Sequence, residues 1–96
     1  MNLVENMHNA VASIPVGRVA TYGDIGVSIG VGARQVGRMM TLLDSSVPWW
    51  RVVHADGTPP SCHGGAAPRL LHAERTPMHG RRVDMTVARY RPEPTT

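Results

Sequence analysis

The sequence contains no lysine and no phenylalanine, and it has a single cysteine. Cys62 therefore cannot form a disulfide within the chain, and no paired Cys or Cys/His spacing predicts zinc, so we expect neither a metal nor a cofactor. No segment approaches the roughly 18 apolar residues of a membrane span, and no signal peptide is recognisable. We expect a soluble cytoplasmic protein that contacts no membrane.

The length of the chain limits the number of domains, and its charge indicates the kind of partner. The 96 residues suffice for one small core, so we predict a monomer with one domain over residues 1–92 and a frayed tail at 93–96. All ten basic residues are arginines, and they outnumber seven acidic residues. An arginine excess favours an acidic partner, above all nucleic acid, because guanidinium binds phosphate and reads guanine edges. Codon bias is the alternative explanation for the missing lysines.

Apolar periodicity predicts three helices in the first half of the chain, over residues 3–14, 22–29 and 33–43. Asn2 with Glu5, and Thr21 with Asp24, resemble the capping pairs that begin helices. The tight turn "GVG" at 30–32 joins the second and third helices. Together these two predict a helix-turn-helix.

The third predicted helix carries a polar face. Arg34 and Arg38 are four residues apart with Gln35 beside them, so this face is the predicted DNA-binding surface. Gly37 lies within the helix, where glycine costs about 0.8–1 kcal/mol relative to alanine. We therefore expect a close approach at Gly37, either by another helix or by a DNA strand.

The second half of the chain is predicted to be less regular. The segment "VPWWRVV" at 47–53 is predicted to be extended, and residues 54–68 form a long loop rich in proline and glycine. A short helix is expected at 69–75, and the alternation in "VDMTVARY" at 83–90 predicts a strand or wing. The predicted fold class is mainly α with a small β wing, a winged helix-turn-helix-like DNA-binding domain.

Five segments occur in the order and approximate spacing of one known family: "IPVGRVATYGDIG", "ARQVGR", "VPWWRVV", a Gly-Gly loop and "LLHAE". They resemble the C-terminal domain of the O6-alkylguanine-DNA alkyltransferases, over about residues 7 to 90. In that family the active-site block is Pro-Cys-His-Arg-Val, and its cysteine accepts the alkyl group. Trp49 occupies the cysteine position here. This pattern resembles the alkyltransferase-like proteins, which bind alkylated guanine without removing the alkyl group and pass the lesion to nucleotide excision repair.

The resemblance implies that no alkyl transfer occurs at this position. The reaction needs a thiolate activated by a base, and an indole offers no such nucleophile. Trp50 stands where the family has its histidine, while Glu74 matches the glutamate that orients it; with Arg51, these residues are a remnant of the relay. We expect Trp49 to pack against a flipped base, a contact worth about 1–3 kcal/mol. The alternative is ordinary core packing, which is favoured for Trp50.

The resemblance also implies how DNA is bound. The second helix of the helix-turn-helix enters the minor groove, and the small residues Ala33 and Gly37 permit this approach. Arg34 matches an arginine that fills the gap left by the extruded nucleotide, and Tyr22 matches a tyrosine that crowds its phosphate. A plain phosphate contact by Arg34 and helix packing by Tyr22 are the alternatives.

The predicted lesion pocket consists of Tyr22, Trp49, Cys62 and His63. Alkyltransferase-like proteins often carry an arginine in the pocket loop that stacks on the extruded base, and Cys62 aligns with it here. His63 is placed to donate a hydrogen bond to the lesion. Alternatively, both are exposed loop residues.

The leading hypothesis is a non-enzymatic sensor of O6-alkylguanine in double-stranded DNA, which flips the lesion and flags it for nucleotide excision repair proteins. One alternative is an active alkyltransferase that uses Cys62, and another is a helix-turn-helix regulator of transcription. Shielding of the lesion from a genuine alkyltransferase is compatible with the first hypothesis.

Overall fold

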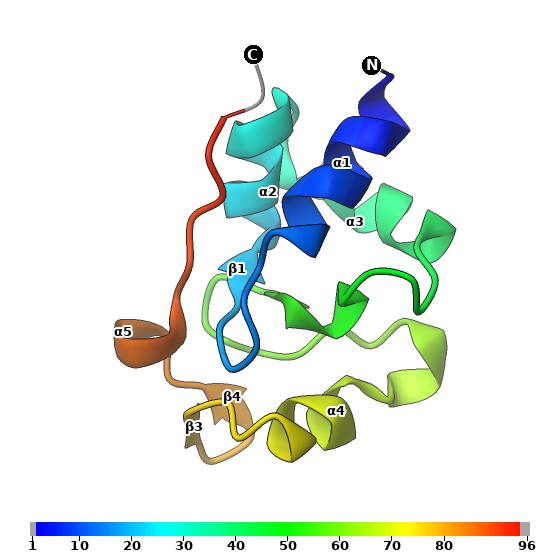
Figure 1. Cartoon of the computed structure of the whole chain (residues 1–96). Coiled ribbons are helices and arrows are strands. Elements are labelled where there is room, and N and C mark those ends of the chain that lie inside the picture. Colours follow the sequence, from blue (N-terminus) through cyan, green and yellow to red (C-terminus); the bar gives the residue numbers. More distant parts are fainter. Residues whose placement is uncertain (1, 95–96) are drawn as a thin grey trace.

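Helices are the main secondary structure of the molecule. The computed structural model describes residues 2–94. In Figure 1 the N-terminal helices gather at one end, and the later helices and a small hairpin lie at the other. The α-helices are α1 (Leu3–Ala12), α2 (Tyr22–Ile29), α3 (Ala33–Met39), α4 (Ala67–Ala73) and α5 (Met85–Ala88). The predicted fold class, mainly helical with small sheets, is confirmed.

The predicted N-caps of α1 and α2 are both present. The backbone N–H of Glu5 donates to Asn2 Oδ1 at 2.8 Å, and α1 ends two residues earlier than predicted. In α2, the N–H of Asp24 donates to Thr21 Oγ1 at 2.9 Å while the N–H of Thr21 donates to Asp24 Oδ2 at 3.1 Å. This reciprocal pair satisfies two backbone donors at the buried start of α2.

The turn between α2 and α3 is packed tightly enough to require glycine. A Cβ on Gly26 would lie 2.4 Å from the carbonyl oxygen of Val31, so no other residue fits there. Gly30 ends α2 in the left-handed conformation, with φ of 85°. The helix-turn-helix is therefore as predicted, although α3 ends at Met39 and continues as a 3-10 turn over Met40–Leu42.

Two short parallel strands position the start of α2. β1 (Ala20–Thr21) pairs with β2 (Val52–Val53), with Ala20 opposite Val52 and Thr21 opposite Val53. The residues that follow the two strands, Tyr22 and His54, consequently lie beside each other.

The wing of the structure is an antiparallel hairpin of β3 (Met78–His79) and β4 (Arg82–Val83), which ends at the start of the segment 83–90 where the sequence predicted it. It docks on the turn after β2, because the N–H of Val83 donates to the carbonyl of Gly57 at 2.9 Å. A Cβ on Gly57 would lie 2.3 Å from the carbonyl oxygen of Val83, so this contact also requires glycine.

Three local predictions were wrong. Trp49–Arg51 is a 3-10 turn rather than extended chain, since the N–H of Arg51 donates to the carbonyl of Pro48 at 3.0 Å. The fourth helix begins at Ala67, two residues before the prediction. The segment after Val83 is not a strand, because Asp84 caps α5 and Val87 is 59% exposed.

The core lies between the three N-terminal helices and the segment that follows α3. Its largest fully buried side chains include Met7, Ile14, Ile25 and Met40. A smaller cluster beneath the wing contains Val19, Val53, Leu71, Val83 and Ala88. Within residues 2–94, no helix has the length and apolarity needed to cross a membrane.

The predicted boundary at 92/93 stays a prediction. The Ser28 hydroxyl donates to the backbone carbonyl of Glu93 at 2.7 Å, so the first tail residue contacts α2. Residues 95–96 of the predicted frayed tail lie outside the described residues.

Candidate nucleic-acid interface

A hollow of about 560 Å³ lies against α3. Three parts of the chain contribute its walls: the start of α2, the exposed face of α3 and the loops after β2. The lining residues are Tyr22, Ala33, Arg34, Gly37, Arg38, Met40, His54, Ser61 and Cys62. The structure thus brings together most residues that the sequence assigned to lesion and DNA binding, and it adds His54, Met40 and Ser61.

The exposed face of α3 is the predicted one. Ala33, Arg34, Gly37 and Arg38 are exposed and Gln35 is half-buried, whereas Val36 and Met39 are buried. A Cβ on Gly37 would meet no heavy atom within 4 Å in the described part of the chain. Packing against another helix of residues 2–94 therefore does not explain this glycine.

Tyr22 stands at the rim of the hollow, as the first residue of α2. Its ring centroid lies 4.7 Å from that of His54, with the planes tilted by 41°. Burial, followed by the nearby Cys62 thiol, raises the pKa of Tyr22 to about 12. The phenol therefore keeps its proton at neutral pH and is available as a hydrogen-bond donor.

Trp49 is not exposed to the hollow. Its side chain is 3% exposed and belongs to the main core cluster, against which Cys62 and Trp50 pack. The His63 ring is stacked on it with centroids 4.0 Å apart and planes at 14°, while the Trp50 ring meets it edge-on at 5.8 Å and 88°. In the free protein Trp49 is therefore a core residue, which was the alternative to a contact with the flipped base.

The two loop residues of the predicted pocket differ in their surroundings. Cys62 is partly buried and lines the hollow, and burial raises the pKa of its thiol. His63 is exposed and its Nε2 lies 2.6 Å from the carbonyl oxygen of Leu43, so that nitrogen carries the proton and donates. This hydrogen bond orients the His63 ring in the free protein.

The predicted relay remnant is a connected cluster. Trp50 Nε1 donates to Glu74 Oε1 at 3.0 Å, and Arg51 Nε donates to the same oxygen at 2.9 Å. Arg51 also pairs with Glu74 Oε2 and donates to the Ile14 carbonyl at 2.8 Å. Burial opposes the charge of Glu74, but hydrogen bonds from Arg51 and Trp50 outweigh it and lower the pKa of the carboxyl. Both carboxylate oxygens of Glu74 are therefore bonded to neighbouring side chains.

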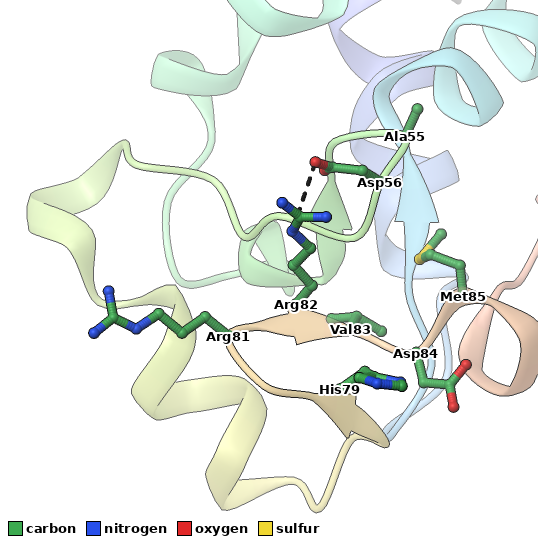
Figure 2. A pocket seen from close by; sticks show the side chains of 8 residues that line it. All are labelled: Ala55, Asp56, His79, Arg81, Arg82, Val83, Asp84 and Met85. Carbon is green, nitrogen blue, oxygen red and sulfur yellow. Dashed lines mark ion pairs between the residues drawn. The ribbon is translucent and has the colours of Figure 1, made fainter.

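A second hollow of similar size lies at the wing, shown in Figure 2. Arg82 Nε lies 3.8 Å from Asp56 Oδ2, and both side chains are more than half exposed. Arg81 extends to the other side, away from Asp56, while Asp84 places a second carboxylate near the hollow (Figure 2). Because its charges are mixed, this hollow is a poor site for an anion.

Sequence reasoning missed the structural use of the C-terminal arginines. Arg89 binds Asp24 through Nη2 and Nε, which donate to the two carboxylate oxygens at 2.8 and 3.0 Å. Arg18 donates to the carbonyl oxygens of Ala88 and Arg89, at 3.0 and 2.6 Å. Arg89 thus fixes the C-terminal segment on α2, and Arg18 binds the same segment from the loop between α1 and β1. The basic end of the sequence is therefore not wholly a binding surface.

The family model for the DNA binding domain of 6-O-methylguanine DNA methyltransferase matches residues 2–76. The chain belongs to this family. Within it, the predicted resemblance to the alkyltransferase-like proteins is confirmed.

Two curated relatives share sequence with part of the chain. Alkyltransferase-like protein 1 of Schizosaccharomyces pombe is 45% identical over 56 residues, which cover 54% of this chain and 52% of the relative. The DNA base-flipping protein of Escherichia coli is 48% identical over 52 residues, which cover 50% of this chain and 40% of the relative. The matches thus span about half of the relatives' length or less.

Solved structures match over nearly the whole chain. Atl1 of S. pombe, in complex with damaged DNA containing O6-carboxymethylguanine, has a TM-score of 0.78 at 28% identity, covering 94% of this chain and 95% of that one. O6-methylguanine methyltransferase of Mycobacterium tuberculosis has a TM-score of 0.68 at 28% identity, covering 91% of this chain and 55% of that one.

Proposed function

We propose that the protein is a non-enzymatic sensor that binds O6-alkylguanine in duplex DNA, turns the damaged base out of the helix and flags it for nucleotide excision repair. The observation that carries the proposal is the hollow between Tyr22, the exposed face of α3 and Cys62. It lies beside the segment in which Trp49 stands at the family's acceptor position. The complex of the similar S. pombe protein with O6-carboxymethylguanine DNA supports this lesion class.

DNA would contact the exposed face of α3. Ala33 and Gly37 leave space over the helix, so a minor-groove wall can approach its backbone closely. Arg34, which lines the hollow, would fill the gap in the base stack, while Gln35 and Arg38 would contact the DNA backbone. Arginine supplies both the charge and the flat surface that these roles require.

The hollow would receive the extruded nucleotide. Tyr22 lies beside His54, and its hydroxyl remains protonated. This hydroxyl would donate a hydrogen bond to the phosphate of the extruded nucleotide. Extrusion of a base costs a few kcal/mol, and this cost is lowest for a damaged base that is poorly paired. The lesion itself therefore contributes to selectivity.

The structure favours retention of the alkyl group. A nucleophile would have to be a thiolate near a base, but Glu74 is bonded to Trp50 and Arg51 and orients no histidine among the described residues. We propose accordingly that the protein acts without metal or cofactor, as a monomer in the cytoplasm, and presents the lesion to excision-repair proteins.

One observation favours a second candidate function, alkyl transfer to Cys62, because this thiol lines the hollow. Burial raises its pKa, which lowers the thiolate fraction at neutral pH, so we favour the sensor. A methyl label that moves from DNA to the wild-type protein and not to a Cys62→Ser variant would establish the transferase instead.

The proposed function is tested by competition between two duplexes that differ in one base, guanine or O6-methylguanine. We expect clear preference for the methylated duplex at fixed salt concentration, because phosphate contacts contribute equally to both. Equal affinity for the two would favour a sequence-directed regulator of transcription and overturn the sensor.

Arg34→Ala is expected to weaken binding to both duplexes by about 10- to 100-fold, because the variant loses support for the extruded state, whose cost is a few kcal/mol. Arg69→Ala is the charge-matched control, since Arg69 is exposed on α4 and does not line the hollow. Fluorescence anisotropy at one salt concentration measures both variants. If the two weaken binding equally, Arg34 contributes only charge.

A further inference from the structure

We propose that His63 is a displaceable cover over Trp49, and that an extruded base must replace the imidazole before it can stack on the indole. This inference rests on the proposed function and adds a step to it. Trp49 is assigned to the lesion, yet it is 3% exposed in the free protein, whereas His63 above it is exposed.

The geometry makes the imidazole and a base competitors for one surface. A centroid distance of 4.0 Å with planes at 14° is a face-to-face stack, the arrangement a flat purine would adopt on the same indole. Trp50 meets Trp49 edge-on and belongs to the Glu74 cluster, so it is not the ring that moves. A base therefore reaches the covered face of Trp49 only after the His63 ring has left it.

The backbone around His63 is suited to such a movement. His63 itself has φ of 57°, a left-handed conformation that is uncommon for residues other than glycine, and departure from it relieves that strain. Gly64 and Gly65 follow with φ of 70° and 72°, and a Cβ built on either would meet nothing within 4 Å. The segment thus has both rotational freedom and open space.

One hydrogen bond connects the cover to the DNA-binding helix. His63 Nε2 donates to the carbonyl oxygen of Leu43 at 2.6 Å, and Leu43 directly follows the 3-10 turn that continues α3. A shift of this turn when α3 contacts DNA would weaken the bond that holds the ring in place. Opening of the cover is in this way linked to docking of the helix.

The cover gives His63 a role in specificity. Any base that enters must offer Trp49 more stacking and polar contact than the imidazole it replaces. An alkylated guanine is poorly paired in the duplex and costs less to extrude than a paired guanine, so more of its stacking energy remains to displace the imidazole. Loss of the ring is therefore expected to favour binding of the lesion and to leave undamaged duplex nearly unaffected.

The test uses His63→Asn, because asparagine tolerates a positive φ and lacks a ring. In a Trp50→Phe background, which leaves Trp49 as the one tryptophan, acrylamide should quench its emission more strongly in the asparagine variant of the free protein. In the otherwise wild-type chain, the same substitution should tighten binding to an O6-methylguanine duplex by about five- to tenfold, mainly through faster association. Undamaged duplex should change less than twofold. His63→Gly, which accommodates the backbone equally, should behave alike.

Three outcomes would overturn the cover. Unchanged quenching would show that the ring does not shield Trp49, weaker lesion binding would show that His63 itself holds the base, and unchanged lesion binding would show that the ring does not compete. Failure of the proposed function is distinguishable, because it appears as absent discrimination by the wild-type protein while the quenching result still reports the cover. Thermal unfolding of each variant confirms that it is folded.

Discussion

The Trp49→Ala variant is expected to lose about 3–5 kcal/mol of its free energy of unfolding, the usual cost of truncating a buried aromatic side chain. Trp49 is 3% exposed and packs in the main core cluster. A small domain has only about 5–15 kcal/mol of total stability, so the substitution would remove a large share of the free energy of unfolding. Urea unfolding followed by circular dichroism measures the change.

Trp49→Phe is the matched control for this prediction. Phenylalanine retains an apolar ring in the core, so the loss of stability should be clearly smaller, while the stacking surface offered to a base is reduced. Reduced lesion preference in the folded Trp49→Phe variant would then report on recognition. A loss below about 1 kcal/mol in Trp49→Ala would contradict the burial of the indole.

Glu74→Ala is expected to destabilise the protein by about 3 kcal/mol, the lower end of the range for removing one partner of a buried ion pair. The lower end applies because the Arg51 and Glu74 side chains remain 10% and 17% exposed. The variant leaves the Arg51 guanidinium and the Trp50 indole N–H without their shared acceptor. Glu93→Ala, an exposed change, should have little effect.

The same cluster predicts a pH dependence. The pKa of Glu74 is lowered from its ordinary value of 4.5, so the folded state binds this proton less readily than the unfolded chain does. Its contribution is therefore complete above about pH 4.5 and is lost as the pH falls through the lower folded pKa. The stability difference between wild type and Glu74→Gln should shrink over that interval. A difference that does not change with pH would contradict the pairing.

Local signals in the sequence predicted the N-terminal half well. Capping pairs at Asn2 and Thr21 are contacts between residues three apart, and Gly30 ends a helix by its own conformation. Apolar periodicity then identified which face of α3 is buried. These features depend on neighbours along the chain and are visible in one sequence.

Features that depend on distant partners were missed. The 3-10 turn at Trp49–Arg51 is anchored by Glu74 and Ile14, far away in sequence, and the pattern of "VPWWRVV" alone favours an extended chain. Alternation after Val83 predicted a strand, but the Asp84 cap begins a helix instead. An aspartate followed by Met-Thr-Val-Ala was the signal that could have indicated it.

In the binding surface, too, local features were predicted and contacts between distant segments were missed. Arg34 and Arg38 on α3 were predicted from helical spacing, and Tyr22 and Cys62 from family resemblance. These four residues line one hollow, whereas the predicted Gln35 does not. His54 was missed because its contact with Tyr22 depends on the parallel pairing of β1 with β2, which no local pattern announces. Stacking of His63 on Trp49 likewise depends on the path of a glycine-rich loop.

The central claim is that the protein holds an alkylated guanine and leaves it unaltered. The most direct measurement is the intact mass of the protein after incubation with excess duplex containing one O6-methylguanine, together with the methyl content of the DNA recovered from the complex. We expect bound lesion, a full complement of methyl groups on the DNA and an unchanged protein mass. A protein heavier by one methyl group, with the guanine restored, would contradict the account.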